Sequence, residues 1–227
     1  HHGSDLEYTV KPHPRFVPYA EEGLGPAAAV LVGSWHTAAS LWEAVPGLDL
    51  VAKTGLGPPG VDTGEFSPLP AAEALGRIEE LAAAIRSEPL SGGFGRNEQA
   101  AVAALDEFAA AAGPRVIFVG KLIVSKGVDL LVAAWPLIHR ENPGARLLLV
   151  GFGAYEAGLR ALVTALGEGD LDSARHIAAV GRQLEGGEAG RLDNLADFLA
   201  IPPMGYAEAA VAAAGSVSFS GRLEHDE

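Results

Sequence analysis

Apolar residues follow two different periods along the chain, and these periods predict strands and helices in alternation. Three short, mostly apolar runs suit buried strands: Ala27–Ser34, Val116–Gly120 and Arg146–Val150. Elsewhere apolar residues recur at every third or fourth position, which is the spacing of an amphipathic helix. Helices of this kind are expected at Thr37–Val45, Ala71–Arg86, Asn97–Ala112 and Gly127–His139. Strands that alternate with helices indicate an α/β fold.

The segment from Val116 to Val150 gives the clearest pattern. It consists of a strand, a helix and a strand within about 35 residues, which is the size of a βαβ unit with parallel strands. Beyond Gly153 the pattern is mostly helical until a last strand at Val217–Ser220. The helices expected there cover residues 154–166, 172–183, 192–200 and 206–214.

Composition narrows the range of partners. Sixteen Lys and Arg residues against 29 Asp and Glu residues give a formal net charge of -13, which repels nucleic-acid phosphates, so we expect no nucleic-acid partner. The absence of cysteine excludes disulfides and thiolate zinc sites. The apolar runs are far shorter than the roughly 20 residues that span a bilayer. We therefore expect a cytoplasmic protein whose membrane contact is at most peripheral.

A proline- and glycine-rich segment marks a boundary within the chain. Gly55–Gly60 holds three glycines and two prolines, which disfavour a helix and favour an extended crossing segment. The run Pro59–Asp62 then leads to Phe66 and Pro68. In this segment we expect Asp62 to bond backbone N–H groups.

Two motifs carry a resemblance to a known family. Pro59–Asp62 with Phe66 and Pro68 is similar to the pattern G-V-D-x-x-x-F-x-P of family 4 glycosyltransferases. The segments Val116–Lys121, Lys126–Leu131 and Leu148–Gly153 resemble that family's strand, G-R/K, K-G-x-x-x-L, helix, strand and G-x-G, in the same order and spacing. The chain therefore resembles a retaining, nucleotide-sugar-dependent glycosyltransferase of the GT-B class.

The resemblance implies an α/β, GT-B-like fold of two Rossmann-like halves, both incomplete in this chain. Residues 1–68 would be the C-terminal part of the acceptor-side half, 69–114 a helical linker, and 115–227 the first part of the donor-nucleotide half. The segment between Leu166 and Val217 lies outside the resemblance, because the family usually passes more directly from that helix to the next strand.

The implied reaction moves a sugar from a nucleoside-diphosphate sugar to an acceptor hydroxyl, with no cofactor and no metal. The resemblance places Gly120, Lys121 and Lys126 at the donor diphosphate. Cations there would stabilise the charge that the leaving diphosphate gains. The alternative is that the lysines are ordinary solvated charges and Gly120 a simple strand-end turn.

The N-terminal segment resembles a strand end whose histidine lines the cleft near the transferred sugar. This resemblance makes His2 the candidate catalytic residue and places Ser4, Glu7 and Tyr8 on the acceptor side. A purification-tag remainder is the alternative for His2, and an exposed turn is the alternative for Glu7 and Tyr8.

A missing motif and two alternative functions bear on the expected activity. The family holds the donor's ribose and sugar with two glutamates that are separated by seven residues, in a region that would follow Glu227, so we expect little transfer by this chain alone. A sugar-nucleotide epimerase of the same fold and a non-catalytic nucleotide-binding or scaffold domain stay open as alternatives.

Trp135, at helical spacing from Leu131, is expected in the core.

Overall fold

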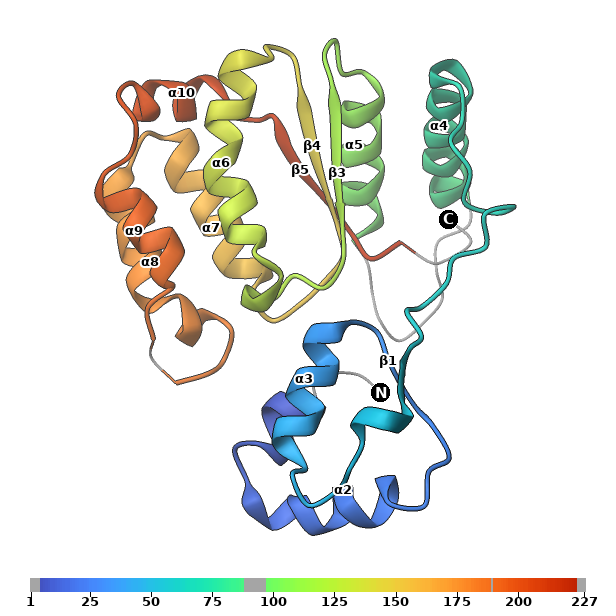
Figure 1. Cartoon of the computed structure of the whole chain (residues 1–227). Helices are drawn as coiled ribbons and strands as arrows, with labels where there is room; N and C mark the ends of the chain where they lie inside the picture. Colours follow the sequence, from blue (N-terminus) through green and yellow to red (C-terminus); the bar gives the residue numbers. More distant parts are fainter. Residues whose placement is uncertain (1–4, 88–96, 189, 224–227) are drawn as a thin grey trace. The chain divides into compact units, whose positions relative to one another are not determined.

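The computed structural model describes residues 5–87, 97–188 and 190–223. The chain divides into two compact units, His1–Pro68 and Leu69–Glu227. Figure 1 shows the elements of each unit, which are treated separately below.

The first unit is built from short helices and one pair of strands. Strand β1 (Val30–Val32) pairs in parallel with β2 (Thr54–Leu56), and Val30 lies opposite Thr54. Its helical elements are η1 (Leu6–Val10), η2 (Pro14–Phe16), α2 (Val17–Leu24), α3 (Trp35–Ala44) and η3 (Val51–Lys53). The buried residues Leu6, Val32 and Leu41 belong to one small core.

Side chains tie the loops of this first unit together. The Lys53 ammonium donates to the backbone carbonyls of Leu24, Gly25 and Ala27 at 3.0, 2.9 and 3.2 Å. In the crossing segment, the Asp62 carboxylate accepts the Gly64 N–H at 2.8 Å. The bonding expected for Asp62 is therefore confirmed.

The second unit contains a three-stranded sheet with helices on both faces. Its strands β3 (Arg115–Val119), β4 (Arg146–Val150) and β5 (Val217–Gly221) are all parallel, with β4 in the middle. Its helices are α4 (Ala71–Ser87), α5 (Glu98–Ala109), η4 (Val124–Lys126), α6 (Val128–Glu141), α7 (Glu156–Gly167), α8 (Leu171–Leu184), α9 (Asp193–Ala200) and α10 (Tyr206–Ala212).

Strand β4 is buried on both sides because its side chains alternate between two layers. Leu147 and Leu149 belong to the core formed with α6 and α7, whereas Leu148 and Val150 belong to a second core formed with α4 and α5. Figure 1 shows α5 and α6 on opposite sides of the sheet. Helices α8, α9 and α10 then pack beside α6 and α7.

Buried aromatic residues anchor the larger core. Trp135 on α6 is 1% exposed, as expected, and its indole N–H donates to the Ser216 hydroxyl at 2.7 Å. The Tyr206 hydroxyl donates to the Ala133 carbonyl at 2.7 Å. Among the described residues, no helix is both long enough and apolar enough to cross a membrane.

The mixed α/β class and the parallel βαβ unit are thus confirmed. Apart from β1 and α3, the elements of the first unit were not expected, namely α2, β2 and the short turns η1, η2 and η3. Helix α2 buries none of its residues fully, although Val17, Ala20 and Leu24 follow the helical spacing and Ala20 and Leu24 pack against the small core. Strand β2 is only three residues long, with Gly55 at its centre, and it depends on pairing with β1. The arrangement of two Rossmann-like halves stays a prediction.

Candidate functional site

The candidate phosphate loop runs from Gly120 to Gly127, at the carboxyl end of β3. In open parallel sheets, ligands bind at this edge. The loop contains the single turn η4 and ends at Gly127, whose positive φ of 65° lets the chain enter α6 directly. The sequence order therefore brings Gly120, Lys121 and Lys126 into one loop.

Backbone hydrogen bonds attach this loop to the loop that follows β4. The Gly120 N–H donates to the Val150 carbonyl at 3.0 Å, and the Leu122 N–H donates to the Phe152 carbonyl at 2.9 Å. In return, the Tyr155 N–H donates to the Leu122 carbonyl at 3.1 Å. The first half of the phosphate loop is therefore held against the β4–α7 loop.

Two glycines after β4 allow this close approach. A Cβ on Gly151, whose φ is 142°, would lie 1.8 Å from the Gly120 carbonyl oxygen, and a Cβ on Gly153 would lie 2.2 Å from that of Leu122. A Cβ on Gly120 would only come within 3.3 Å of the Phe118 ring. The glycine requirement is thus strongest at Gly151 and Gly153.

The two candidate lysines are exposed. In the part of the chain that the structure describes, neither Lys121 nor Lys126 has an ion-pair or side-chain hydrogen-bond partner. Lys126 is the last residue of η4. The next residue, Gly127, is the N-cap of α6 and has no side chain to cap that helix. Both ammonium groups are therefore available to an anion at the positive end of a helix.

A further basic residue follows β5 at the same edge of the sheet. Arg222 comes directly after Gly221, and its guanidinium lies 5.7 Å from the centre of the Phe152 ring. Sequence reasoning did not select Arg222. Its position after a third parallel strand was the signal that could have found it.

Three polar side chains lie beside the phosphate loop: Glu185 is half-buried, whereas Asp129 and Tyr155 are buried. The Glu185 carboxylate, at the end of α8, accepts the Val124 N–H at 3.0 Å. Asp129 is only 4% exposed, and its burial raises the pKa of its carboxyl group. Burial, together with the nearby charges of Asp129 and Glu185, raises the pKa of the Tyr155 hydroxyl. That hydroxyl is buried without a hydrogen-bond partner among the described residues.

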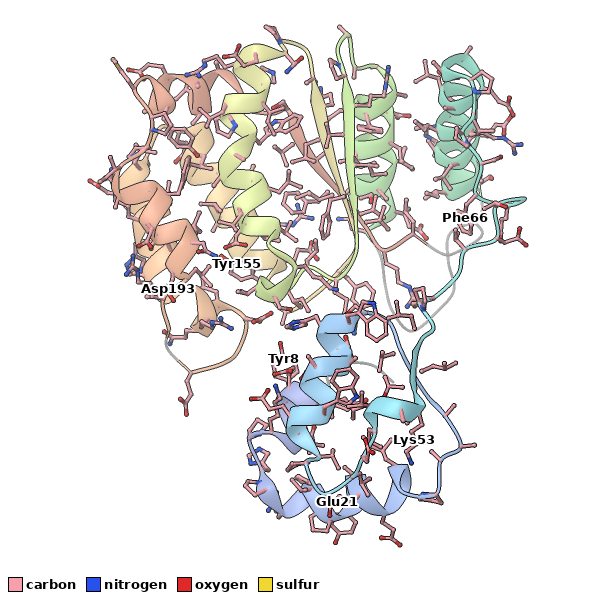
Figure 2. The ribbon with its side chains drawn as sticks, in the orientation of Figure 1. Tyr8, Glu21, Lys53, Phe66, Tyr155 and Asp193 are labelled. Atoms are coloured by element: carbon pink, nitrogen blue, oxygen red, sulfur yellow. The ribbon has the colours of Figure 1, made fainter. Side chains whose placement is uncertain are left out.

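A polar pocket of about 310 Å³ opens beside this cluster. Residues from both the phosphate loop and the segment after α7 line it, among them Ser125, Asp129, Arg182, Asp193 and Asn194. Hydrogen bonds from the backbone N–H groups of Leu130 and Asp129, and then the attraction of Arg182, partly offset the effect of burial on the pKa of Asp129. Figure 2 labels Tyr155, just before α7, and Asp193, at the start of α9.

The candidate acceptor-side residues lie in the first unit. Glu7 accepts a hydrogen bond from the Ser40 hydroxyl and pairs with Lys11 at 3.2 Å, and these two contacts lower the pKa of its carboxyl group. Tyr8, labelled in Figure 2, is 72% exposed. His2 and Ser4 lie outside the described residues.

The described ranges contain no cluster of three or more His, Asp or Glu side chains that could hold a metal ion. The exposed polar side chains of the phosphate loop are those of Lys121, Ser125 and Lys126.

Comparison with known proteins points to the same region. Residues 113–202 match the family model "Glycosyl transferases group 1", and this stretch contains the phosphate loop and the loop after β4. The match supports a glycosyltransferase.

Curated relatives agree with this result over part of their length. The chain is 35% identical over 113 residues to the "GDP-mannose-dependent alpha-(1-6)-phosphatidylinositol monomannoside mannosyltransferase" of Mycobacterium tuberculosis (strain ATCC 25618 / H37Rv). This alignment covers 50% of the chain and 22% of the relative. The protein of the same name from Mycolicibacterium smegmatis is 28% identical over 145 residues, which is 64% of the chain and 29% of the relative. The chain therefore spans less than a third of these relatives. No solved structure matched.

Proposed function

We propose that the loop Gly120–Gly127 binds the diphosphate of a nucleoside-diphosphate sugar in a retaining, GT-B, family 4 glycosyltransferase. The observation that carries this proposal is the pair of exposed lysines, Lys121 and Lys126, which have no side-chain partner among the residues that the structure describes. They lie at the carboxyl end of β3, within the stretch that matches the family model.

The chemistry of transfer gives these lysines a role. As the bond to the sugar breaks, the leaving diphosphate gains negative charge, and a cation beside it stabilises the transition state more than the ground state. The start of α6 adds partial positive charge at the same place. In this proposal the lysines and the helix neutralise the phosphates without a metal ion or cofactor.

Gly120, Gly151 and Gly153 would serve the site through their backbone. Because the loops after β3 and β4 approach through these residues, no side chain stands between the two backbones. The N–H groups of Gly120 and Gly151 already donate to the carbonyls of Val150 and Gly221, so these glycines would hold the loops in place rather than contact a phosphate.

The relatives' printed name supports GDP-mannose as the donor. The acceptor hydroxyl would be bound on the side of the first unit. There, His2 would contact the transferred sugar, and Ser4, Glu7 and Tyr8 would contact the acceptor.

Calorimetric titration with GDP, UDP and ADP tests the proposal. Lys121→Gln and Lys126→Gln each remove one positive charge, and Arg77→Gln on the exposed face of α4 is the matched control. We expect GDP to bind most tightly, and each lysine variant to weaken it about tenfold or more, because a charge-assisted hydrogen bond contributes about 1.5–3 kcal/mol. The control should stay within about twofold.

Absence of binding by any of the three nucleotides would contradict the proposal. Equal losses in the lysine variants and in Arg77→Gln would also contradict it, because they would reflect net charge rather than a site. Either result would favour the non-catalytic scaffold alternative.

A further inference from the structure

The middle of the phosphate loop is held by a residue from a distant segment. Val124 begins the turn η4, where the first N–H groups of a helix lack partners within the helix. The preceding residue, Ile123, supplies no side-chain cap. Instead, the Glu185 carboxylate, 61 residues further along, accepts the Val124 N–H at 3.0 Å. Glu185, which lies outside the loop, thus accepts the hydrogen bond that an N-cap side chain would otherwise accept.

Helix α8, which precedes Glu185, is closely packed. Ala174, Ala178 and Gly181 on α8 are buried. The Leu192 N–H donates to the Ala178 carbonyl at 2.8 Å, and a Cβ on Gly181 would lie 2.3 Å from the Leu192 side chain. Because α8 is packed this closely, it fixes the position of Glu185, the C-cap residue that follows Leu184.

Other hydrogen bonds of the loop involve other N–H groups, so the Val124 N–H is bonded by Glu185. The bonds to the β4–α7 loop reach only Gly120 and Leu122. The N–H groups of Lys126 and Gly127 bond within the loop, to Ile123 and Val124. The Val124 side chain packs against the larger core, whereas its N–H depends on Glu185, and Val124 lies between the two lysines.

We propose that Glu185 is a positioning residue, which caps η4 and so sets the placement of Lys121 and Lys126 for the diphosphate. This inference rests on the function proposed above. It gives α8 and the residue that follows it, which lie within the stretch that matches the family model, a role in donor binding. A carboxylate repels phosphate, so its use near this loop is as an acceptor for the Val124 N–H.

Two substitutions separate the effect of the Glu185 hydrogen bond from the effect of its charge. Glu185→Gln keeps an acceptor and removes the charge, whereas Glu185→Ala removes both. Glu168→Ala is the matched control, because Glu168 is an exposed C-cap of α7 with the same φ of -88° as Glu185.

Amide hydrogen exchange of the ligand-free chain, followed by NMR, tests the cap directly. We expect exchange at Val124 to be about tenfold faster in Glu185→Ala, because its N–H loses its partner. Exchange at Val124 should be unchanged in Glu185→Gln and Glu168→Ala. The amides of β4 serve as a check that the sheet stays folded.

GDP titration then tests the functional consequence. Glu185→Ala should weaken binding about three- to tenfold, as the loss of a helix cap would. Glu185→Gln should bind GDP as tightly as the wild type or more tightly, because a nearby negative charge is gone.

The inference is overturned if Val124 exchange is unchanged in Glu185→Ala, or if GDP affinity is unchanged in that variant while Lys126→Gln weakens it. It is also overturned if Glu185→Gln is as impaired as Glu185→Ala. If the wild type binds no nucleotide, the proposed function fails and the positioning role fails with it, whereas the exchange experiment still decides whether Glu185 caps the loop.

Discussion

Replacement of Gly151 by alanine tests the contact between the loops after β3 and β4. The new Cβ would lie 1.8 Å from the Gly120 carbonyl oxygen and 2.9 Å from its carbon. Both are backbone atoms, so a side-chain rotation cannot relieve the clash. The φ of 142° is also a conformation that residues with a Cβ rarely adopt.

Two other glycines in the same unit separate these contributions. Gly127 has a positive φ of 65° but nothing within 4 Å of its Cβ position, and Gly76 lies inside α4 with an equally open position. We expect Gly127→Ala to destabilise the second unit by about 1 kcal/mol or somewhat more. Gly76→Ala should stabilise it by about 0.5–1 kcal/mol, because alanine favours the helix.

For Gly151→Ala we expect a loss of about 2–5 kcal/mol, which combines backbone strain with overpacking. Urea unfolding followed by the fluorescence of Trp135 measures this, on a Trp35→Phe, Trp42→Phe background, so that only the buried tryptophan of the second unit reports. The reasoning is refuted if Gly151→Ala costs no more than Gly127→Ala, since the clash would then be absent.

Further expectations concern the buried polar groups of the second unit. Tyr155→Phe should leave stability unchanged or raise it, because the lost hydroxyl has no partner in the described structure, whereas Tyr206→Phe should cost about 1 kcal/mol; urea unfolding of the two variants compares them. Ser216→Ala should cost about 1–3 kcal/mol, because it leaves the buried Trp135 indole N–H unpaired, and a loss below that range in the same assay would contradict this. Burial raises the pKa of Asp129 above its unfolded value, so its contribution to stability is present at low pH and lost as the pH rises through the folded pKa. Asp129→Asn should therefore gain stability relative to the wild type between about pH 4 and pH 7, and a constant difference in unfolding free energy across that range would contradict this.

Local signals explain which elements could be predicted from the sequence. Asn97 was expected to start a helix, and its side chain accepts the Ala100 N–H at 3.0 Å because Asn is a good N-cap. The runs that became β3 and β4 are apolar and β-branched or leucine-rich, so their character does not depend on distant partners.

Contacts between distant segments could not be predicted in this way. β2 exists because Thr54–Leu56 meets β1, and nothing in those three residues indicates a strand. The contact from Glu185 to Val124 crosses 61 residues, and it depends on how α8 packs against α7 and α9. The sequence marks the lysines of the candidate site, but not the residues behind them.

The central claim is that Gly120–Gly127 and Gly151–Gly153 bind the diphosphate of a nucleotide. Amide chemical shifts of the isotope-labelled chain, recorded during a titration with GDP, test it most directly. The account predicts that the largest shifts occur in these two loops and at the start of α6, and that Lys126→Gln reduces them at equal GDP concentration. Saturable shifts confined to other parts of the second unit, with these loops unchanged, would contradict it.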